Sequence, residues 1–122
     1  MGIRLSHLFL YVSDLARSRR FYTELLGLRV LLEESGYVRV GVPDGLHIGM
    51  EVGKPWQIGA HGIEMNLEVD DVDAWTQRLQ AAGVQIDQGP SDMPWGARHS
   101  FFHDPDGYRL SIFTPVPATA AV

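Results

Sequence analysis

The chain has 122 residues, enough to bury one continuous core but too few for two independent ones, and no apolar run approaches the roughly 20 residues that a membrane span needs. Its net charge is -5 and its basic residues form no cluster beyond Arg17, Arg19 and Arg20, so nucleic acid is not expected as a partner. Because cysteine is absent and the N-terminus lacks the apolar stretch of a signal peptide, we exclude disulfide and thiolate chemistry and expect a cytoplasmic protein.

The first half of the chain predicts the element order βαβββ. Asp14 is placed to cap a helix, and Gly27 is placed to end it. Residues 53–62 have turn composition and no period, so we expect them to connect two halves. The predicted elements are a strand over 7–13, a helix over 15–26, and strands at about 30–33, 37–42 and 46–52.

The second half repeats this order. The predicted elements are a strand at about 63–69, a helix over 71–82, and strands near 84–87, 98–103 and 108–113. Three anchors align the halves: Asp14 with Asp71, Gly27 with Gly83, and Pro43-Asp44-Gly45 with Pro105-Asp106-Gly107. Each half, at roughly 55 residues, would be marginal alone, so we expect the two to pack together. We predict a single domain over 1–122, with modules at about 5–52 and 63–114, the connection 53–62 and a mobile tail at 115–122.

Five short motifs follow one another along residues 5–115. They are His7-Leu-Phe-Leu-Tyr-Val-Ser-Asp14, Phe21-Tyr22 through Leu26-Gly27-Leu28, Val69-Asp-Asp-Val-Asp73, Pro94-Trp95-Gly96-Ala97-Arg98 and Asp104-Pro105-Asp106-Gly107. In order and spacing this set resembles the vicinal oxygen chelate superfamily of glyoxalase I, bleomycin resistance proteins and extradiol dioxygenases. The resemblance implies an α+β fold in which two tandem βαβββ modules form a cup-shaped mixed sheet with helices on the outside. It also implies a small-molecule ligand or a metal inside the cup, and a homodimer.

The internal alignment locates the positions at which the resemblance implies metal ligands. These positions are His7, Gly49, Glu64 and Ser111. Only two of the four side chains can bind a metal, because glycine and serine replace the carboxylates that would supply the anionic part of the site. A family-type metal site is therefore incomplete, and no cofactor is firmly implied.

An alternative metal set uses His47, which lies two residues before Gly49 and so on the same face of its strand. His7, His47 and Glu64 would then supply two imidazoles and one carboxylate to a divalent metal such as Fe, Mn, Zn or Ni. A second alternative is that His7 and Glu64 only hydrogen-bond each other. His61, His99 and His103 fit no ligand spacing and are assigned no role, and His103 is expected at the surface.

Strand alternation also predicts the lining of a ligand cleft. A mixed aromatic and acidic lining suits a planar or partly cationic small organic molecule. Such a molecule would bind between the side chains that share the face of His7. The opposite faces of the strands are expected to form the core under the helices, and their residues are Leu8, Leu10, Val12, Leu46, Ile48, Met50, Val52, Leu67 and Val69. The residues of the cleft face are Phe9, Tyr11, His47, Glu51, Asn66, Glu68, Arg109 and Phe113.

Trp56 and Trp95 are candidate lids of this cleft, and a purely structural role is an equal alternative for each. Trp75, on the second predicted helix, is expected in the core. The Trp95-Gly96-Ala97-Arg98 stretch is similar to the corresponding segment of bleomycin resistance proteins, which sequester a ligand without a catalytic metal. Arg98 would either contact the ligand or pair with a nearby carboxylate.

We therefore expect a protein that binds a small organic molecule without a catalytic metal, of the resistance or sequestration type. The alternative is a metal-dependent enzyme, lyase or dioxygenase-like, that uses His7, His47 and Glu64. A third hypothesis is a metal-free enzyme in which His7 and Glu64 transfer a proton.

Overall fold

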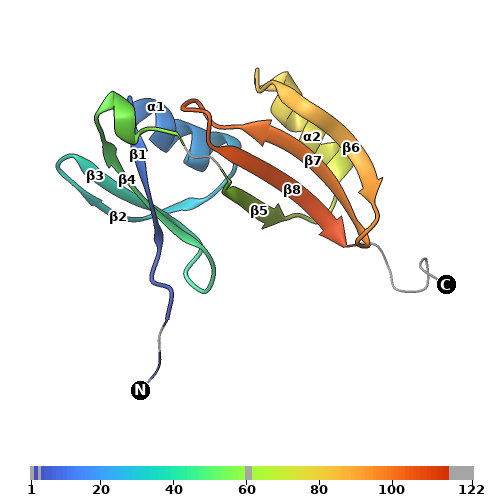
Figure 1. Ribbon diagram of the computed structural model, residues 1–122, viewed down its shortest axis with the longest axis horizontal. Coiled ribbons are helices and arrows are strands. Elements are labelled where there is room, and N and C mark those ends of the chain that lie inside the picture. The colour runs from blue at the N-terminus through green and yellow to red at the C-terminus, as the bar shows by residue number, and fades with distance from the viewer. Residues whose placement is uncertain (1, 3, 60–61, 116–122) are drawn as a thin grey trace. The chain divides into compact units, whose positions relative to one another are not determined.

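The computed structural model describes residues 2, 4–59 and 62–115, and the chain divides into two compact units, residues 1–59 and 60–122 (Figure 1). Each unit contains one four-stranded mixed sheet and has the element order βαβββ that the sequence predicts. Within the described ranges, no helix is long and apolar enough to cross a membrane.

In the first unit the strand order is β1-β4-β3-β2. The first strand pairs with β4 in parallel, and the remaining pairs are antiparallel. A 3-10 turn, η2 (Pro55–Gln57), follows the last strand. The strands are β1 (Leu8–Val12), β2 (Arg29–Glu34), β3 (Tyr37–Gly41) and β4 (His47–Val52), and the helical segment between β1 and β2 consists of α1 (Leu15–Arg20) and η1 (Phe21–Leu25).

The second unit has the same topology, with the strand order β5-β8-β7-β6. Again the first strand pairs in parallel with the last, and the other pairs are antiparallel. One helix lies against one face of this sheet (Figure 1). The elements are β5 (Glu64–Glu68), α2 (Val72–Ala81), β6 (Ile86–Met93), β7 (Ala97–His103) and β8 (Arg109–Pro115).

The two anchors at the ends of the helices have equivalent structural roles in the two units. The Asp14 and Asp71 carboxylates each accept a hydrogen bond from the backbone N–H three residues later, at 3.0 and 3.1 Å, and so cap the two helices. Gly27 and Gly83 follow the helices with φ of 77° and 91°, in the left-handed region that glycine enters without a steric cost. The duplicated order of elements is therefore confirmed.

The helical segment of the first unit contains a π-helical turn that its counterpart lacks. The segment from the capping aspartate to the glycine is one residue longer in the first unit (14–27) than in the second (71–83). The Leu26 N–H donates to the carbonyl oxygen of Phe21, five residues earlier, at 3.1 Å. The helix predicted over 15–26 is therefore present to Leu25, but beyond Arg20 it is a π-helical turn and not a continuation of the α-helix.

Most core residues of each unit come from the helix-covered face of its sheet and from its helix, while Ala97 and Phe101 lie on the opposite face of β7. Of the nine residues predicted for the helix-covered face, four are buried (Leu10, Val12, Ile48 and Met50), four are half-buried (Leu8, Leu46, Leu67 and Val69), and Val52 is 58% exposed at the end of β4. Trp75 is only half-buried, and the Arg78 guanidinium covers its ring at 4.5 Å from the centroid, so its assignment to the core is wrong. The buried apolar residues are Leu10, Val12, Phe21, Tyr22, Leu26, Val38, Val40, Ile48 and Met50 in the first unit, and Met65, Val72, Leu79, Ala97, Phe101, Phe102, Tyr108, Leu110 and Ile112 in the second.

Two strands of the second unit run further than predicted. The edge strand β6 reaches Met93 through two irregularities in its pairing with β7, and it tolerates Pro90 because an edge strand can lack a backbone donor. Strand β8 continues to Pro115, so the predicted tail begins inside this strand. The remainder of that tail, residues 116–122, lies outside the described residues.

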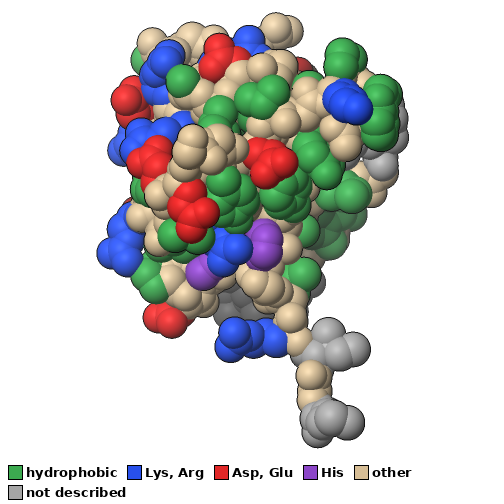
Figure 2. Space-filling view, turned by 90° about the vertical axis from the view of Figure 1, so that its left-hand side faces the viewer, with side chains coloured by type: hydrophobic (Ala, Val, Ile, Leu, Met, Phe, Trp, Pro, Cys, Tyr) green, Lys and Arg blue, Asp and Glu red, His purple; other side chains and the backbone are tan. Residues whose placement is uncertain are grey.

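Charged and hydrophobic side chains are mixed on the surface. On the face drawn in Figure 2, acidic and basic side chains alternate around hydrophobic ones. The exposed large hydrophobic residues are Leu5, Phe9, Val30, Leu32, Val42, Val52, Trp56, Ile63 and Trp95.

Candidate functional site

The face of the second sheet that points away from α2 carries a cluster of polar and aromatic side chains. Thr76 of α2 contacts Ser100 of β7 at 2.7 Å, so Ser100 marks the helix-covered face and its neighbours His99 and Phe101 lie on the other face. We call this second face the open face, because α2 does not pack on it. The β7–β8 register places His99 opposite Phe113. We call the set on this open face the His99 cluster; it consists of Asn66, Trp95, His99, Phe101, Ser111 and Phe113.

A directed chain of hydrogen bonds runs through the cluster. The Trp95 indole N–H, which can only donate, lies 3.1 Å from His99 Nε2, so this nitrogen is the acceptor. The imidazole proton is then on Nδ1, which lies 3.2 Å from the Ser111 hydroxyl oxygen. Ser111 in turn donates to the side-chain oxygen of Asn66. These directions require His99 to be a neutral imidazole with its proton on Nδ1.

Burial favours the same protonation state. Only 6% of the His99 surface is exposed, and the resulting desolvation lowers the pKa of the imidazole, while the negative charge of Glu64 opposes this with a smaller effect. Since the usual pKa of histidine is about 6.5, His99 is neutral near pH 7.

Flat rings surround the imidazole. Its plane is within 10° of that of Phe101 and within 16° of that of Phe113, with centroid distances of 5.4 and 5.1 Å. The Trp95 ring meets it edge-on at 5.4 Å and is 65% exposed. The cluster therefore combines a row of aromatic rings with a single imidazole acceptor at its solvent side, as a site for a flat ligand would require.

An ion pair borders this cluster. Arg109 Nε donates to Glu64 at 2.6 Å, and the Arg109 guanidinium lies 4.7 Å from the centroid of the Phe101 ring. The two residues are directly opposite each other in the β5–β8 register. Charge of both signs is thus available next to the aromatic row.

A second aromatic group lies in the first unit. Phe9 meets Tyr11 edge-on at 5.1 Å and lies nearly parallel to Tyr37 at 6.2 Å. Arg39 Nε donates to the Tyr37 hydroxyl at 3.0 Å. A β-carbon added at Gly49 would come within 2.5 Å of that hydroxyl oxygen, so the Tyr37 phenol occupies the space beside Gly49.

Comparison with known proteins identifies the family. The family model described as "Glyoxalase/Bleomycin resistance protein/Dioxygenase superfamily" matches residues 4–112. The chain belongs to this superfamily. The predicted family and its fold of two βαβββ modules are therefore confirmed.

Relatives within the superfamily carry different names. A probable lactoylglutathione lyase of Vibrio parahaemolyticus is 28% identical and covers 98% of this chain and 96% of its own. A probable chloroplastic lactoylglutathione lyase of Arabidopsis thaliana is also 28% identical, but this chain spans only 37% of its length. The antibiotic-binding protein TnmS3 of Streptomyces sp. CB03234 is 29% identical, with a TM-score of 0.76 over 93% of this chain and 99% of its own.

The four positions at which the resemblance implies metal ligands have other contacts in this protein. His7 Nδ1 lies 2.9 Å from the Ser6 hydroxyl, and Glu64 pairs with Arg109. Tyr37 fills the space at Gly49, and Ser111 belongs to the His99 hydrogen-bond chain. Within either unit, the described residues include no group of three His, Asp or Glu side chains that could hold a metal ion.

The predicted set of His7, His47 and Glu64 joins residues of both units and stays a prediction, as does the His7–Glu64 hydrogen bond. His47 Nε2 lies 3.3 Å from the carbonyl oxygen of Pro43. Three further residues predicted for the cleft, Glu51, Glu68 and Trp56, are exposed, and Trp56 reaches 78%.

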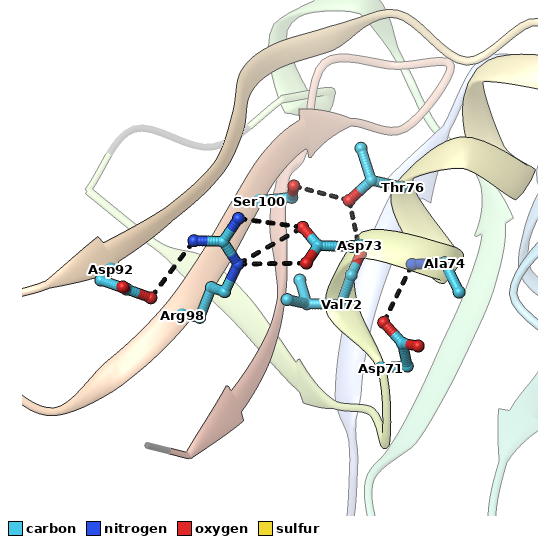
Figure 3. A network of polar contacts seen from close by, with 8 residues as sticks. All are labelled: Asp71, Val72, Asp73, Ala74, Thr76, Asp92, Arg98 and Ser100. Carbon is cyan, nitrogen blue, oxygen red and sulfur yellow. Dashed lines mark hydrogen bonds and ion pairs between the residues drawn. The ribbon is translucent and has the colours of Figure 1, made fainter. Parts of the chain in front are cut away.

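Arg98 lies on the helix-covered face of the second sheet, opposite the His99 cluster. Its guanidinium pairs with Asp73 of α2 at 3.1 Å and with Asp92 of β6 at 3.2 Å (Figure 3). Hydrogen bonds to the two carboxylates raise the pKa of Arg98 above its usual range. The pairing with a carboxylate, one of the two alternatives left by the sequence, is therefore present, and it fastens the start of α2 to the β6–β7 hairpin.

His99 is the residue that sequence reasoning missed. The signal was available, because the turn at Asp104 fixes which residues of β7 and β8 face each other. The Asp104 carboxylate accepts hydrogen bonds from the backbone N–H groups of Asp106 and Tyr108, at 2.9 and 2.8 Å. Counting outward from this turn places His99 opposite Phe113, which the sequence analysis had assigned to the cleft. His103, expected at the surface, is exposed and pairs with Asp87, and His61 lies outside the described residues.

Proposed function

We propose that this superfamily member binds a small planar organic molecule on the open face of its second sheet, without a catalytic metal. The observation that carries the proposal is the His99 cluster, in which a neutral imidazole lies in a row of nearly parallel aromatic rings next to the exposed indole of Trp95. Such a row offers a flat ligand stacking contacts, each of which is worth about 0.5–1.5 kcal/mol beyond simple burial.

The hydrogen bonds of the cluster favour binding over nucleophilic catalysis. A serine nucleophile needs a base that accepts its proton, but Ser111 donates to Asn66 and faces the protonated nitrogen of His99. The chain of donors therefore holds the imidazole in one orientation and leaves Ser111 unactivated. This is the arrangement of a rigid recognition surface rather than of a reacting pair.

The relation to TnmS3 supports a sequestration role, because that protein is described as antibiotic-binding and matches nearly the full chain. The relatives named lactoylglutathione lyase favour a second candidate, a metal-dependent lyase or dioxygenase-like enzyme that uses His7, His47 and Glu64. The two proposals differ in their need for a metal, and one experiment separates them.

The experiment begins with elemental analysis of untagged protein and a titration with Zn, Mn, Fe and Ni ions. The same protein is then titrated with a panel of planar aromatic compounds in the presence of a chelator, with tryptophan fluorescence as the signal. We expect binding that the chelator leaves unchanged and that Phe113→Ala weakens. Arg98→Ala is the matched control, since Arg98 lies on the opposite face of the same sheet.

The contrary result is about one metal per chain that is lost in His7→Ala, together with aromatic binding that requires this metal. That result would make the metal-dependent enzyme the better proposal. We also propose a cytoplasmic homodimer, by resemblance to the superfamily, and sedimentation of the full chain measures its oligomeric state.

A further inference from the structure

Trp95 combines an exposed side chain with a buried hydrogen-bond partner. The residue is 65% exposed, yet its indole N–H is bonded to the imidazole of His99, which is 6% exposed. Trp95 belongs to the turn between β6 and β7, which is closed by a hydrogen bond from the Gly96 N–H to the Met93 carbonyl oxygen at 3.1 Å. A flat ring with an N–H donor thus occupies the solvent side of His99.

The chemistry of His99 limits what can take the place of this indole. Its Nδ1 proton is directed at Ser111 inside the cluster, so Nε2 is the nitrogen of the ring that an outside group can reach. A ligand that leaves a buried nitrogen acceptor without a donor is expected to bind about tenfold or more weakly than one that supplies the donor. Any molecule that displaces Trp95 must therefore bring a donor of its own or accept this loss of affinity.

We infer that His99 determines the specificity of this site: its ligand is a planar aromatic molecule with a ring N–H or a phenolic O–H that donates to His99 Nε2, and Trp95 is the internal group that such a ligand displaces. The inference rests on the proposed function and adds the chemical class of the ligand. Phenolates and N-alkylated rings should bind more weakly than their protonated or unalkylated counterparts, because neither can donate to a neutral imidazole.

Displacement of Trp95 requires little rearrangement. The indole contacts His99 through one hydrogen bond and one edge-on ring contact, and most of its surface already faces solvent. A ligand that stacks on Phe113 and donates to Nε2 would replace both contacts. The indole in effect competes with the ligand for the same acceptor.

Indole and 1-methylindole form a matched pair of probes, because they have nearly the same shape and differ in the donor. We would titrate each into the full-length protein and follow the indole N–H signals of its tryptophans by two-dimensional ¹H–¹⁵N NMR. The Trp95 signal is identified by its absence in Trp95→Phe. We expect indole to bind about tenfold more tightly than 1-methylindole, corresponding to one buried hydrogen bond, and to shift the Trp95 signal.

Two variants sharpen the test. Trp95→Phe removes the competing donor and keeps an aromatic ring, so we expect it to bind indole several-fold more tightly than the wild type. His99→Phe keeps a ring in the aromatic row and removes the acceptor, so we expect the preference for indole to disappear. Trp75→Phe, a change of a tryptophan on α2 and therefore on the helix-covered side of the same sheet, serves as the control and should alter neither affinity.

The results also distinguish a failure of the donor requirement from a failure of the proposed binding function. Equal affinity for the two probes in the wild type and in Trp95→Phe, with shifts confined to the His99 cluster, would overturn the donor requirement and leave the binding face intact. Absence of binding by both probes in every variant would overturn the specificity and count against the proposed function itself. A preference for indole that survives in His99→Phe would assign the donor contact to another residue and overturn the role of His99.

Discussion

The phenol of Tyr37 packs directly over Gly49, and a β-carbon at residue 49 would lie 2.5 Å from its hydroxyl oxygen and 3.1 Å from two of its ring carbons. Residue 49 is also one of the positions where the superfamily resemblance implies a metal ligand. Residue 49 is a glycine, and the Tyr37 ring fills the space in which a carboxylate side chain would lie. A metal ligand at residue 49 would therefore require a change at both residues.

This contact predicts the cost of any side chain at residue 49. Gly49→Ala forces Tyr37 to move and to give up its hydrogen bond from Arg39, so we expect the free energy of unfolding to fall by about 1–3 kcal/mol in urea titrations. In a Tyr37→Ala background the same change should cost little. Gly89→Ala, where an added β-carbon meets no atom within 4 Å, is the control. Equal losses in both backgrounds would contradict the contact.

The neutral state of His99 predicts how stability depends on pH. Burial lowers the pKa of His99 in the folded protein, so below about pH 6.5 the unfolded chain takes up a proton that the folded protein does not. The contribution of His99 to stability is fully present above the pKa that this residue has in the unfolded chain. It is lost as the pH falls through the lower pKa that His99 has in the folded protein. We expect the wild type to lose stability relative to His99→Phe as the pH falls from 7.5 to 5, as measured by thermal unfolding. Because both proteins contain the same carboxylates, the comparison removes the effect of those groups.

Protonation should also release Trp95, since a protonated Nε2 can no longer accept from the indole N–H. Tryptophan fluorescence of the wild type should then change over the same pH interval in which His99 titrates by NMR, and Trp95→Phe should lack this component. A fluorescence change that is equally present in Trp95→Phe would show that it comes from Trp56 or Trp75.

The parts of this fold that the sequence predicts are those fixed by local signals. Capping aspartates, the glycines after the helices and the period of apolar residues lie within a few residues of the elements they define, so the order of elements and both helix starts could be inferred. The His99 cluster depends instead on which residues of β7 and β8 face each other, and on a tryptophan four residues before His99 folding back onto it. Neither relationship is visible in the alternation of a single strand.

The π-helical turn illustrates the same limit. The apolar period over residues 15–26 is compatible with a continuous helix, and only comparison with the other half exposes the extra residue. The irregular pairing of β6 likewise leaves no alternation to detect around Pro90. In both places tertiary packing determines the backbone more than local preference does.

The helix cap of the second unit gives a simple test of the duplicated architecture. Asp71→Ala removes the acceptor for the backbone N–H of Ala74, so we expect a loss of about 1 kcal/mol in the free energy of unfolding. Asp71→Asn keeps an acceptor and should retain most of the stability. Asp14→Ala should have a similar effect in the first unit, and a loss in Asp71→Asn as large as in Asp71→Ala would contradict the capping role.

The last prediction concerns the hydrogen bond that joins α2 to β7 beneath the His99 cluster (Figure 3). Thr76 and Ser100 are both buried, and the Thr76 hydroxyl also donates to the Val72 carbonyl oxygen, which leaves Ser100 to donate to Thr76. Thr76→Val keeps the shape but leaves the Ser100 hydroxyl unpaired, so we expect a loss of about 1–3 kcal/mol. Adding Ser100→Ala should recover part of it, and a double-mutant cycle by urea unfolding measures this coupling. Additive losses in the double variant would mean that water satisfies Ser100, and that the hydrogen bond contributes little to holding the helix against the sheet.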